Sequence, residues 1–196
     1  MGPGETPQSG RDRILDAAYE LFSRAGVRAV GVDTITAQAA VAKMTLYRNF
    51  PSKSDLALAF LALREERWTK AWLQVDIARR ASSPAGQLLA IFDAFSEWFA
   101  REDFEGCAFV TSMLAIDDHD DLVRRGCVAR LANIRAFVGE LADAAGVEEP
   151  ERFAAQWHIL MKGSIVAAEE GDREAARLAR DLGALLLERH GVARPH

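Results

Sequence analysis

The apolar residues of this chain recur at helical spacing along almost its whole length. In the first such segment, about residues 11–25, Ile14, Ala18, Leu21 and Phe22 are three or four residues apart and share one face. No stretch combines the strict alternation of apolar and polar positions with the turn signals that a hairpin needs. We therefore predict an all-α protein.

The same periodicity, with its breaks, predicts about nine helices, three short ones followed by six that are mostly longer. Two capping boxes, Ser9 with Asp12 and Ser52 with Asp55, mark helix starts, and Gly26 ends the first helix. The predicted helices cover about residues 11–25, 32–39, 43–50, 53–79, 84–101, 107–115, 120–145, 150–170 and 172–190.

The fourth predicted helix is long, and we expect it to belong to both parts of the chain. Leu56, Phe60, Trp68 and Trp72 fall on one ladder at four-residue spacing, which Arg64 interrupts. From these elements we predict a flexible arm at residues 1–10, a DNA-binding domain at 11–55 and a helical ligand-binding and dimerisation domain at 56–196.

Composition narrows the class of protein. Of 196 residues, 49% are hydrophobic and 27% charged, which is typical of a globular protein. No apolar run is long enough to span a bilayer, the first residues lack the apolar core of a secretory signal, and Cys107 and Cys127 have no metal-like spacing. We therefore expect a cytoplasmic protein without a membrane partner.

Charge is distributed unevenly. The net charge of −5 argues against a chain coated with nucleic acid. From residue 9 to 55, however, seven basic and five acidic side chains give +2, which leaves −7 on the rest of the chain. This asymmetry indicates a small anion-facing module on a larger acidic body.

The stretch VAKMTLYRNFPSKSDL, residues 41–56, carries the candidate chemistry. Two short helices joined by a tight turn and braced by a preceding helix form a helix-turn-helix, whose second helix can enter the DNA major groove. Lys43 and Thr45 suit base edges or phosphates, Tyr47 and Arg48 suit phosphates, and Lys53 lies in a first helical turn that favours anions. The alternative is an ordinary amphipathic helix with a solvated polar face.

Residues 13–61, RILDAAYELFSRAGVRAVGVDTITAQAAVAKMTLYRNFPSKSDLALAFL, resemble the DNA-binding domain of the tetracycline-repressor (TetR) family of bacterial transcription regulators. The matching framework consists of Ala17, Leu21, Phe22, Gly26, Ile35, Ala39 and Val41, followed by TLYRNFPSKSDL. The resemblance implies an all-helical homodimer, a recognition helix at residues 42–50 and a C-terminal domain that binds a small molecule.

This chain departs from the family pattern at several positions. Val30 and Gly31 stand where members often have Thr or Ser, and Ala40 stands where the turn usually has Gly. Ala42 replaces a common Ser or Thr cap, and Met44 replaces a common Gly. By the resemblance, Tyr47 and Lys53 are phosphate contacts, and Lys43, Met44 and Thr45 lie nearest the bases. We add Arg48 to the predicted DNA contacts for its charge, and Thr34 and Thr36 because they can replace the missing hydroxyl at the phosphate.

The C-terminal part is rich in large apolar residues that can form either an ordinary core or a pocket for a hydrophobic or aromatic ligand. The candidate pocket residues are Trp68, Trp72, Phe92, Phe95, Phe99, Phe109, Met113, Trp157, His158 and Met161. Two apolar stripes near the end can pack within one chain or form a four-helix dimer interface. The candidate interface residues are Ile165, Ala168, Leu178, Leu182, Leu185 and Leu186.

The acidic run DDHDD, Asp117 to Asp121, allows a metal reading, but a capped and solvated helix start explains it better. No nucleophile–base pair and no glycine-rich phosphate loop appears, so we predict no enzyme activity, no metal and no cofactor. The leading hypothesis is a ligand-responsive regulator, most simply a repressor, that binds operator DNA as a homodimer and is released by a small effector. The alternative is a helical-bundle carrier or enzyme with a vestigial DNA-binding module.

Overall fold

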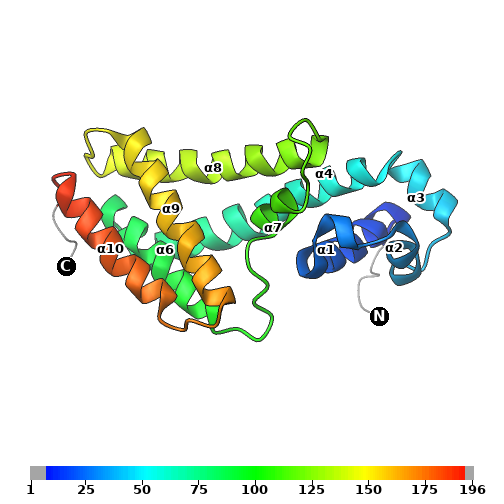
Figure 1. Cartoon of the computed structure of the whole chain (residues 1–196), viewed down its shortest axis with the longest axis horizontal. Helices are drawn as coiled ribbons and strands as arrows, with labels where there is room; N and C mark the ends of the chain where they lie inside the picture. Colours follow the sequence, from blue (N-terminus) through cyan, green and yellow to red (C-terminus); the bar gives the residue numbers. More distant parts are fainter. Residues whose placement is uncertain (1–7, 193–196) are drawn as a thin grey trace, which may run out of the picture. The chain divides into compact units, whose positions relative to one another are not determined.

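The computed structural model describes residues 8–192, and every regular element in this range is helical (Figure 1). The elements are α1 (Gly10–Ala29), α2 (Val32–Gln38), α3 (Lys43–Asn49), α4 (Lys53–Arg64), the π-helix η1 (Glu65–Gln74), α5 (Val75–Arg80), α6 (Pro84–Phe99), α7 (Ala108–Leu114), α8 (Leu122–Ala144), α9 (Pro150–Glu169) and α10 (Ala175–Arg189). Because α4, η1 and α5 follow one another without a break, they correspond to the fourth predicted helix. The predicted all-α fold is confirmed.

The chain forms two compact units. The first runs through Arg64 and includes Ala108–Cys127; the second comprises Glu65–Cys107 and the residues from Val128 onward. The predicted functional domains, 11–55 and 56–196, are a different division and stay a prediction. The predicted arm, residues 1–10, lies mostly outside the described residues. Within those residues, no helix combines the length and apolar character needed to cross a membrane.

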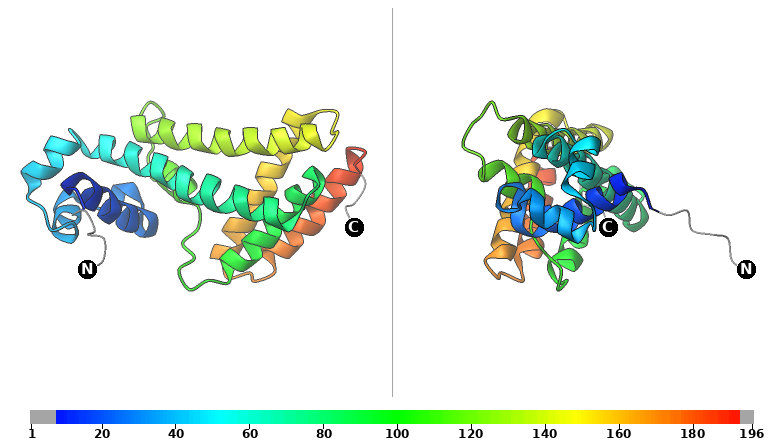
Figure 2. Two further views of the ribbon diagram at one scale, coloured as in Figure 1. Left: turned by 180° about the vertical axis from the view of Figure 1, so that it is seen from behind. Right: turned by 90° about the vertical axis from the view of Figure 1, so that its right-hand side faces the viewer.

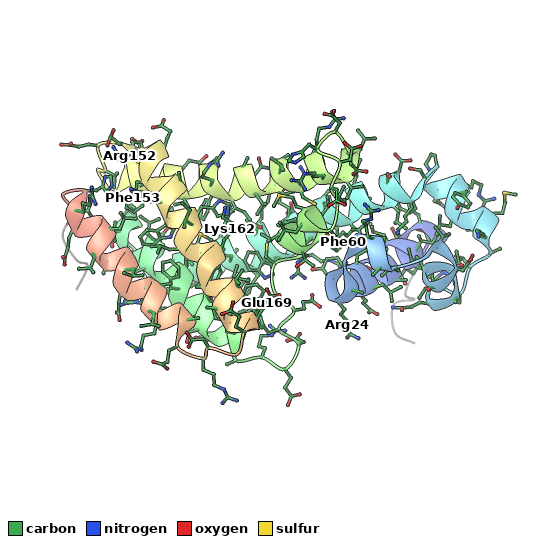
Figure 3. The ribbon with its side chains drawn as sticks, viewed as in Figure 1. Arg24, Phe60, Arg152, Phe153, Lys162 and Glu169 are labelled. Atoms are coloured by element: carbon green, nitrogen blue, oxygen red, sulfur yellow. The ribbon has the colours of Figure 1, made fainter. Side chains whose placement is uncertain are left out.

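The core of the first unit is built where α4 packs on α1. Phe60 is fully buried, and its ring meets those of Phe22 and Tyr19 edge-on at centroid distances of 5.4 and 5.8 Å (Figure 3 labels Phe60). Arg64, one turn further along α4, is also buried, and its Nη1 donates hydrogen bonds to the Tyr19 hydroxyl at 3.2 Å and to Ser23 Oγ at 3.4 Å. A cation can therefore occupy this inward position because α1 supplies it with hydroxyl acceptors.

Local signals set the helix ends of the first unit as predicted. Ser9 Oγ accepts a hydrogen bond from Asp12 N at 3.1 Å, and Ser52 Oγ accepts one from Asp55 N at 3.1 Å. Gly26 interrupts the helical backbone of α1 with φ 74° and ψ 159°, after which a short helical stretch continues to Ala29. Only glycine adopts that positive φ without steric cost.

The ten-residue π-helix η1 corrects the predicted ladder of the long helix. The buried positions along α4, η1 and α5 include Leu56, Phe60, Arg64, Thr69, Leu73 and Ile77, so the interval of four residues is broken once by an interval of five. A π-helix has more residues per turn than an α-helix and absorbs this extra residue. Trp68 and Trp72, predicted inward, are consequently only half-buried.

The second unit is centred on Trp157 of α9. Helices α6, α9 and α10 pack side by side (Figure 2). The fully buried Trp157 ring stacks on Phe153 at 5.2 Å and lies 5.2 Å from the Phe92 ring. Gly183 of α10 makes room for it, since a Cβ there would lie 2.8 Å from the Trp157 Cη2 atom. The close approach of α10 to these rings therefore depends on glycine.

Candidate nucleic-acid interface

The turn between α2 and α3 is tight and contains a strained residue. Val41 N donates a hydrogen bond to Thr36 O at 3.1 Å, which closes the turn. Ala40 has φ 50°, in the left-handed region that glycine tolerates and alanine does not favour. The turn expected from the sequence is thus present, and the alanine that replaces the usual glycine carries a backbone cost.

The inward face of α3 fixes the helix to the first unit. Leu46 is fully buried and Phe50 is 3% exposed. The Arg11 guanidinium lies over the Phe50 ring, with Cζ 5.0 Å from the centroid, which adds a cation–π contact. These contacts leave the opposite face of a seven-residue helix turned to solvent.

That outward face presents chemistry suited to DNA. The Met44 side chain is 79% exposed and Tyr47 is 41% exposed, although both are large and apolar enough to be buried elsewhere. Lys43 and Arg48 are exposed beside them, and Thr45 is half-buried. Side chains that can donate hydrogen bonds to an anion therefore share one face with the apolar thioether of Met44. This combination suits contact with both phosphates and bases.

Neither helix of the pair has a side-chain cap. The N-cap positions are Gly31 for α2 and Ala42 for α3, and neither makes a side-chain hydrogen bond to the first turn. Ala42 lacks the oxygen that Ser or Thr would supply there. The expectation that these two caps are missing is confirmed.

Lys43 is held by a partner that the sequence analysis missed. Its Nζ lies 2.8 Å from Asp33 Oδ1 of α2, in an exposed ion pair. The hydrogen bond that Lys43 Nζ donates to Asp33 Oδ1 raises the pKa of Lys43, so the ammonium stays charged at any physiological pH. A DNA contact by Lys43 must compete with this acid, whose position ten residues earlier carries no local signal.

Lys53 lies at the start of α4 and is partly buried. Its Nζ donates a hydrogen bond to Arg28 O at 3.4 Å. Burial, and then the positive charge of Arg28, lower the pKa of Lys53. Arg28 was not among the predicted contacts, and the structure places its charge close to Lys53. An anion bound there would relieve the repulsion between the two cations.

The two predicted threonine contacts on α2 differ in availability. Thr36 is buried, and its Oγ1 donates a hydrogen bond to Asp33 O at 3.0 Å. Thr34 is exposed. Both remain predictions, but the geometry favours Thr34 as the residue whose hydroxyl can reach a phosphate.

The candidate pocket residues are divided between the two units. Phe109 and Met113 belong to the first unit and the other eight to the second. In the second unit the rings of Trp68, Phe95 and Trp98 are in contact, with centroids 4.9 to 6.0 Å apart. The indole nitrogen of Trp68 is buried and has no hydrogen-bond partner among the described residues. A buried donor without a partner is a polar group that a ligand acceptor would satisfy if it reached this nitrogen.

His158 is the most perturbed group among the pocket candidates. Its side chain is 5% exposed on α9. Burial, followed by the positive charges of Lys162 and Arg135, lowers the pKa of His158 to about 4. The imidazole is therefore neutral at pH 7 and can donate or accept one hydrogen bond without adding charge.

The candidate dimer surface has an exposed apolar stripe on α10. Leu178, Leu182 and Leu185 are 46%, 52% and 53% exposed. Ala168 and Leu186 are half-buried, whereas Ile165 is buried inside its own unit. On α9 the exposed apolar side chains are Ile159 and Val166, which the sequence analysis did not select.

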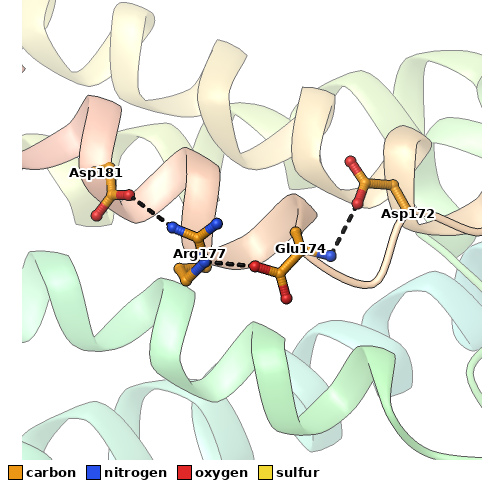
Figure 4. A network of polar contacts seen from close by, with 4 residues as sticks. All are labelled: Asp172, Glu174, Arg177 and Asp181. Carbon is orange, nitrogen blue, oxygen red and sulfur yellow. Dashed lines mark hydrogen bonds and ion pairs between the residues drawn. The ribbon is translucent and has the colours of Figure 1, made fainter.

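A polar network borders this stripe on α10 (Figure 4). Arg177 Nε lies 2.5 Å from Glu174 Oε2, and its Nη1 lies 3.2 Å from Asp181 Oδ2. Asp172 Oδ1 accepts a hydrogen bond from Glu174 N at 2.8 Å. Exposed leucines beside charged residues form the apolar centre and polar rim typical of an interface.

The acidic run at the start of α8 acts as a helix cap, as predicted. Asp121 Oδ1 accepts hydrogen bonds from Val123 N at 2.8 Å and Arg124 N at 3.1 Å. Asp118 Oδ1 accepts one from Asp120 N at 2.9 Å. Within residues 8–192 there is no group of three or more side chains placed to hold a metal ion.

A family model and several known proteins match part of this chain in sequence. Residues 14–60 match the family model for bacterial regulatory proteins of the tetR family. The transcriptional repressor KstR of Rhodococcus jostii is 47% identical over 57 residues, which cover 29% of this chain and 27% of the relative. The transcriptional activator FasR of Mycolicibacterium smegmatis is 33% identical over 96 residues, covering 49% and 42%. These matches span less than half of either relative.

Solved structures match nearly the whole fold. The TetR-family regulator SCO4454 from Streptomyces coelicolor superposes with a TM-score of 0.84 at 27% identity, covering 94% of this chain and 91% of the other. A putative TetR regulator, sav143, from Streptomyces avermitilis gives 0.83 at 26% identity, covering 94% and 100%. Residues 14–60 therefore match the tetR-family domain, and nearly the whole fold is similar to that of solved TetR-family transcriptional regulators.

Proposed function

We propose that this protein binds operator DNA as a homodimer and is a ligand-controlled transcriptional regulator, most simply a repressor. The observation that carries the proposal is the two-sided character of α3. Leu46 and Phe50 fix the helix to the first unit, while Lys43, Met44 and Tyr47 face solvent. A stable protein gains little from exposing Met44 unless that face meets a partner.

Dimerisation follows from what a helix-turn-helix needs. One seven-residue recognition helix reads too few base pairs for specificity, and a two-fold dimer reads two half-sites one helical turn apart. The exposed stripe of Leu178, Leu182 and Leu185 supplies an apolar surface for such an interface. We expect Leu182→Asp to yield monomers in sedimentation, with Leu122→Asp, at another exposed leucine, as the matched control.

The effector is proposed to bind in the second unit and to be apolar or aromatic. The ring contacts around Trp68 and Trp98, together with the unpartnered indole nitrogen of Trp68, support this choice. Since the relatives named above include both a repressor and an activator, the sign of regulation is tested by reporter expression with and without the protein.

The DNA-binding proposal is tested by selecting bound DNA from a random pool with the purified full-length protein. We expect a palindrome whose half-sites lie about one helical turn, roughly 34–36 Å, apart. Enrichment of no sequence, with only salt-sensitive general binding, would contradict operator recognition.

Variants then assign the contacts on the selected operator. Arg48→Ala should weaken binding to all sequences and reduce the slope of log affinity against log salt by about 1, because one phosphate contact is lost. Tyr47→Phe should weaken binding by removing a phenol donor. Lys70→Ala removes one exposed charge from η1 and serves as the control. Equal affinities for Arg48→Ala and Lys70→Ala would show that α3 is not the recognition helix.

A further inference from the structure

Asp33 is the only acidic residue in the segment 30–54, which contains the helices α2 and α3 of the helix-turn-helix. The basic residues of this segment are Lys43, Arg48 and Lys53. DNA phosphates repel a carboxylate, so an acid weakens a surface that serves only to neutralise backbone charge. The presence of Asp33 beside the recognition helix therefore needs another explanation.

Folding stability does not supply that explanation. Lys43 Nζ lies 2.8 Å from Asp33 Oδ1, but the two side chains are 54% and 83% exposed. Water and salt screen an ion pair at such a surface, and pairs of this kind add little to stability. The main consequence of the pair is that an ammonium and a carboxylate are held side by side in solvent.

The pair lies at the end of α3 that reads bases in a helix-turn-helix. Lys43 is the first residue of α3, and the N-terminal residues of a recognition helix contact base edges in the major groove. Because Asp33 Oδ1 accepts a hydrogen bond from Lys43 Nζ, a base edge that meets the ammonium also lies near the carboxylate. Asp33 therefore reaches the same part of the groove from α2.

Both groups keep hydrogen-bonding capacity after they pair. An ammonium has three N–H donors, and Lys43 uses one of them on Asp33. Within the described residues, the second carboxylate oxygen of Asp33, Oδ2, makes no hydrogen bond. A phosphate that draws Lys43 away must break the pair, whereas a base edge with acceptors next to a donor can be bound with the pair intact.

We propose, resting on the DNA-binding function proposed above, that Asp33 is a specificity-determining residue that reads one G·C base pair together with Lys43. Lys43 donates to guanine O6 and N7, and Asp33 accepts from the N4 amino group of the paired cytosine. Guanine O6 and cytosine N4 are hydrogen-bonded to each other, about 2.9 Å apart. The 2.8 Å between Lys43 Nζ and Asp33 Oδ1 matches this spacing.

An A·T base pair suits the two side chains less well. Guanine presents two acceptors side by side, N7 and O6, whereas adenine presents N7 followed by the N6 amino donor. A carboxylate placed over the paired thymine meets the acceptor O4 and is repelled. We expect a preference for G·C over A·T of roughly tenfold at one position of each half-site, as for other two-point base contacts.

The test is selection of bound DNA from a random pool by the full chain, followed by affinity measurements on the recovered operator. Asp33→Ala and Lys43→Met should each reduce the preference at the same G·C position to about twofold or less, and the double variant should lose no more, because both residues act on one base pair. Thermal unfolding confirms that each variant is folded. An unchanged G·C preference in Asp33→Ala, or a preference for A·T at the position that Lys43→Met alters, would overturn the proposal.

A modified operator isolates the contact made by Asp33. Replacement of the cytosine by 2-pyrimidinone removes the N4 amino group and leaves the guanine in place. This operator should bind the unsubstituted protein several-fold more weakly than the original, on the order of one lost hydrogen bond to a charged group. Asp33→Ala should bind the two operators equally. The same loss in both proteins would show that Asp33 does not contact the cytosine.

Glu20→Gln is the matched control. Glu20 is also an exposed acid of the first unit whose carboxylate contacts α2, with Oε2 2.7 Å from Gln38 Nε2, and the variant also removes one negative charge. It should strengthen binding to every sequence by the same small factor and leave the base preference unchanged. If Asp33→Ala behaves in this way, Asp33 only repels phosphates and the base-reading proposal is wrong.

The outcomes for Asp33 and for the proposed function are separable. Enrichment of no sequence by the unsubstituted protein would contradict operator recognition, and base reading by Asp33 with it. Enrichment of a palindrome whose base preferences are the same in Asp33→Ala would remove only the role of Asp33 and leave the regulator intact.

Discussion

The helix-turn-helix of the first unit and the α6–α9–α10 packing of the second use glycine and alanine in opposite ways. In the turn before α3, Ala40 holds φ 50°, where glycine would be unstrained. In the middle of α10, Gly183 occupies a helical position where alanine would be preferred by about 1 kcal/mol. At each position, the chain thus has a residue that the local backbone conformation disfavours.

The two violations have different causes. At Gly183 packing decides, because the Trp157 and Phe92 rings occupy the space that a Cβ would need. Ala40 is exposed, so burial of its side chain does not offset the strained backbone. In the second unit, the burial of aromatic rings therefore outweighs the low helix propensity of Gly183. In the first unit, the backbone strain at Ala40 stays uncompensated in the turn beside the candidate interface.

The largest effect that we expect in this comparison is a loss of folding stability at acidic pH, because the second unit buries the ionisable side chain of His158. Its pKa is about 4 when folded, against about 6.5 unfolded. The unfolded chain therefore binds a proton first, and stability from this group is full above pH 6.5 and lost as pH falls towards 4. The shift corresponds to roughly 3 kcal/mol. We expect urea denaturation to show this loss.

The control is the same titration on His158→Gln, which keeps all carboxylates. The positive charges of Lys162 on α9 and Arg135 on α8 act on the imidazole and remain in the variant. The wild-type slope should exceed that of the variant between about pH 6.5 and 4. Identical slopes would show that His158 is not held neutral by its surroundings.

Gly183→Ala tests whether packing really decides at the α10 position. The new Cβ would lie 2.8 Å from Trp157 Cη2, and the fully buried ring has little room to move. Overpacking costs about 1–3 kcal/mol, which outweighs the helical gain. We expect net destabilisation of about 1–2 kcal/mol by thermal or urea unfolding.

Gly139→Ala in α8 is the matched control. A Cβ at Gly139 would lie 3.7 Å from Ala154 Cβ, an ordinary contact, so this variant should be neutral or stabilised by up to about 1 kcal/mol. Two variants with the same effect would mean that helix propensity, not the Trp157 ring, governs both sites.

Sequence alone predicted the features that local chemistry controls. Ser9 with Asp12 and Ser52 with Asp55 cap their helices because the partners are three residues apart. The outward position of Met44 follows from the inward positions of Leu46 and Phe50 on a short helix. Both kinds of signal can be recognised in the sequence without knowledge of the rest of the fold.

Features set by distant packing could not be predicted. The π-helix η1 shifts the inward residue from Trp68 to Thr69, which depends on the contacts made before and after it. On α9, Ile165 and Val166 are both apolar, and only tertiary packing decides which one is buried. The Asp33–Lys43 pair joins two helices across a turn, so no periodicity within one helix reveals it.

Ala40→Gly tests the uncompensated cost in the turn. An L-residue in the left-handed region costs about 1–2 kcal/mol, and glycine removes that cost while losing more backbone entropy on folding. The net expectation is a stabilisation of about 0.5–1 kcal/mol, measured as an increased midpoint in urea with unchanged slope. Ala37→Gly, at an exposed position inside α2, should instead destabilise by about 0.5–1 kcal/mol. If both substitutions destabilise, Ala40 is not strained in solution. If Ala40→Gly stabilises the protein and Ala37→Gly destabilises it, the turn keeps its alanine despite a cost that a single substitution would remove.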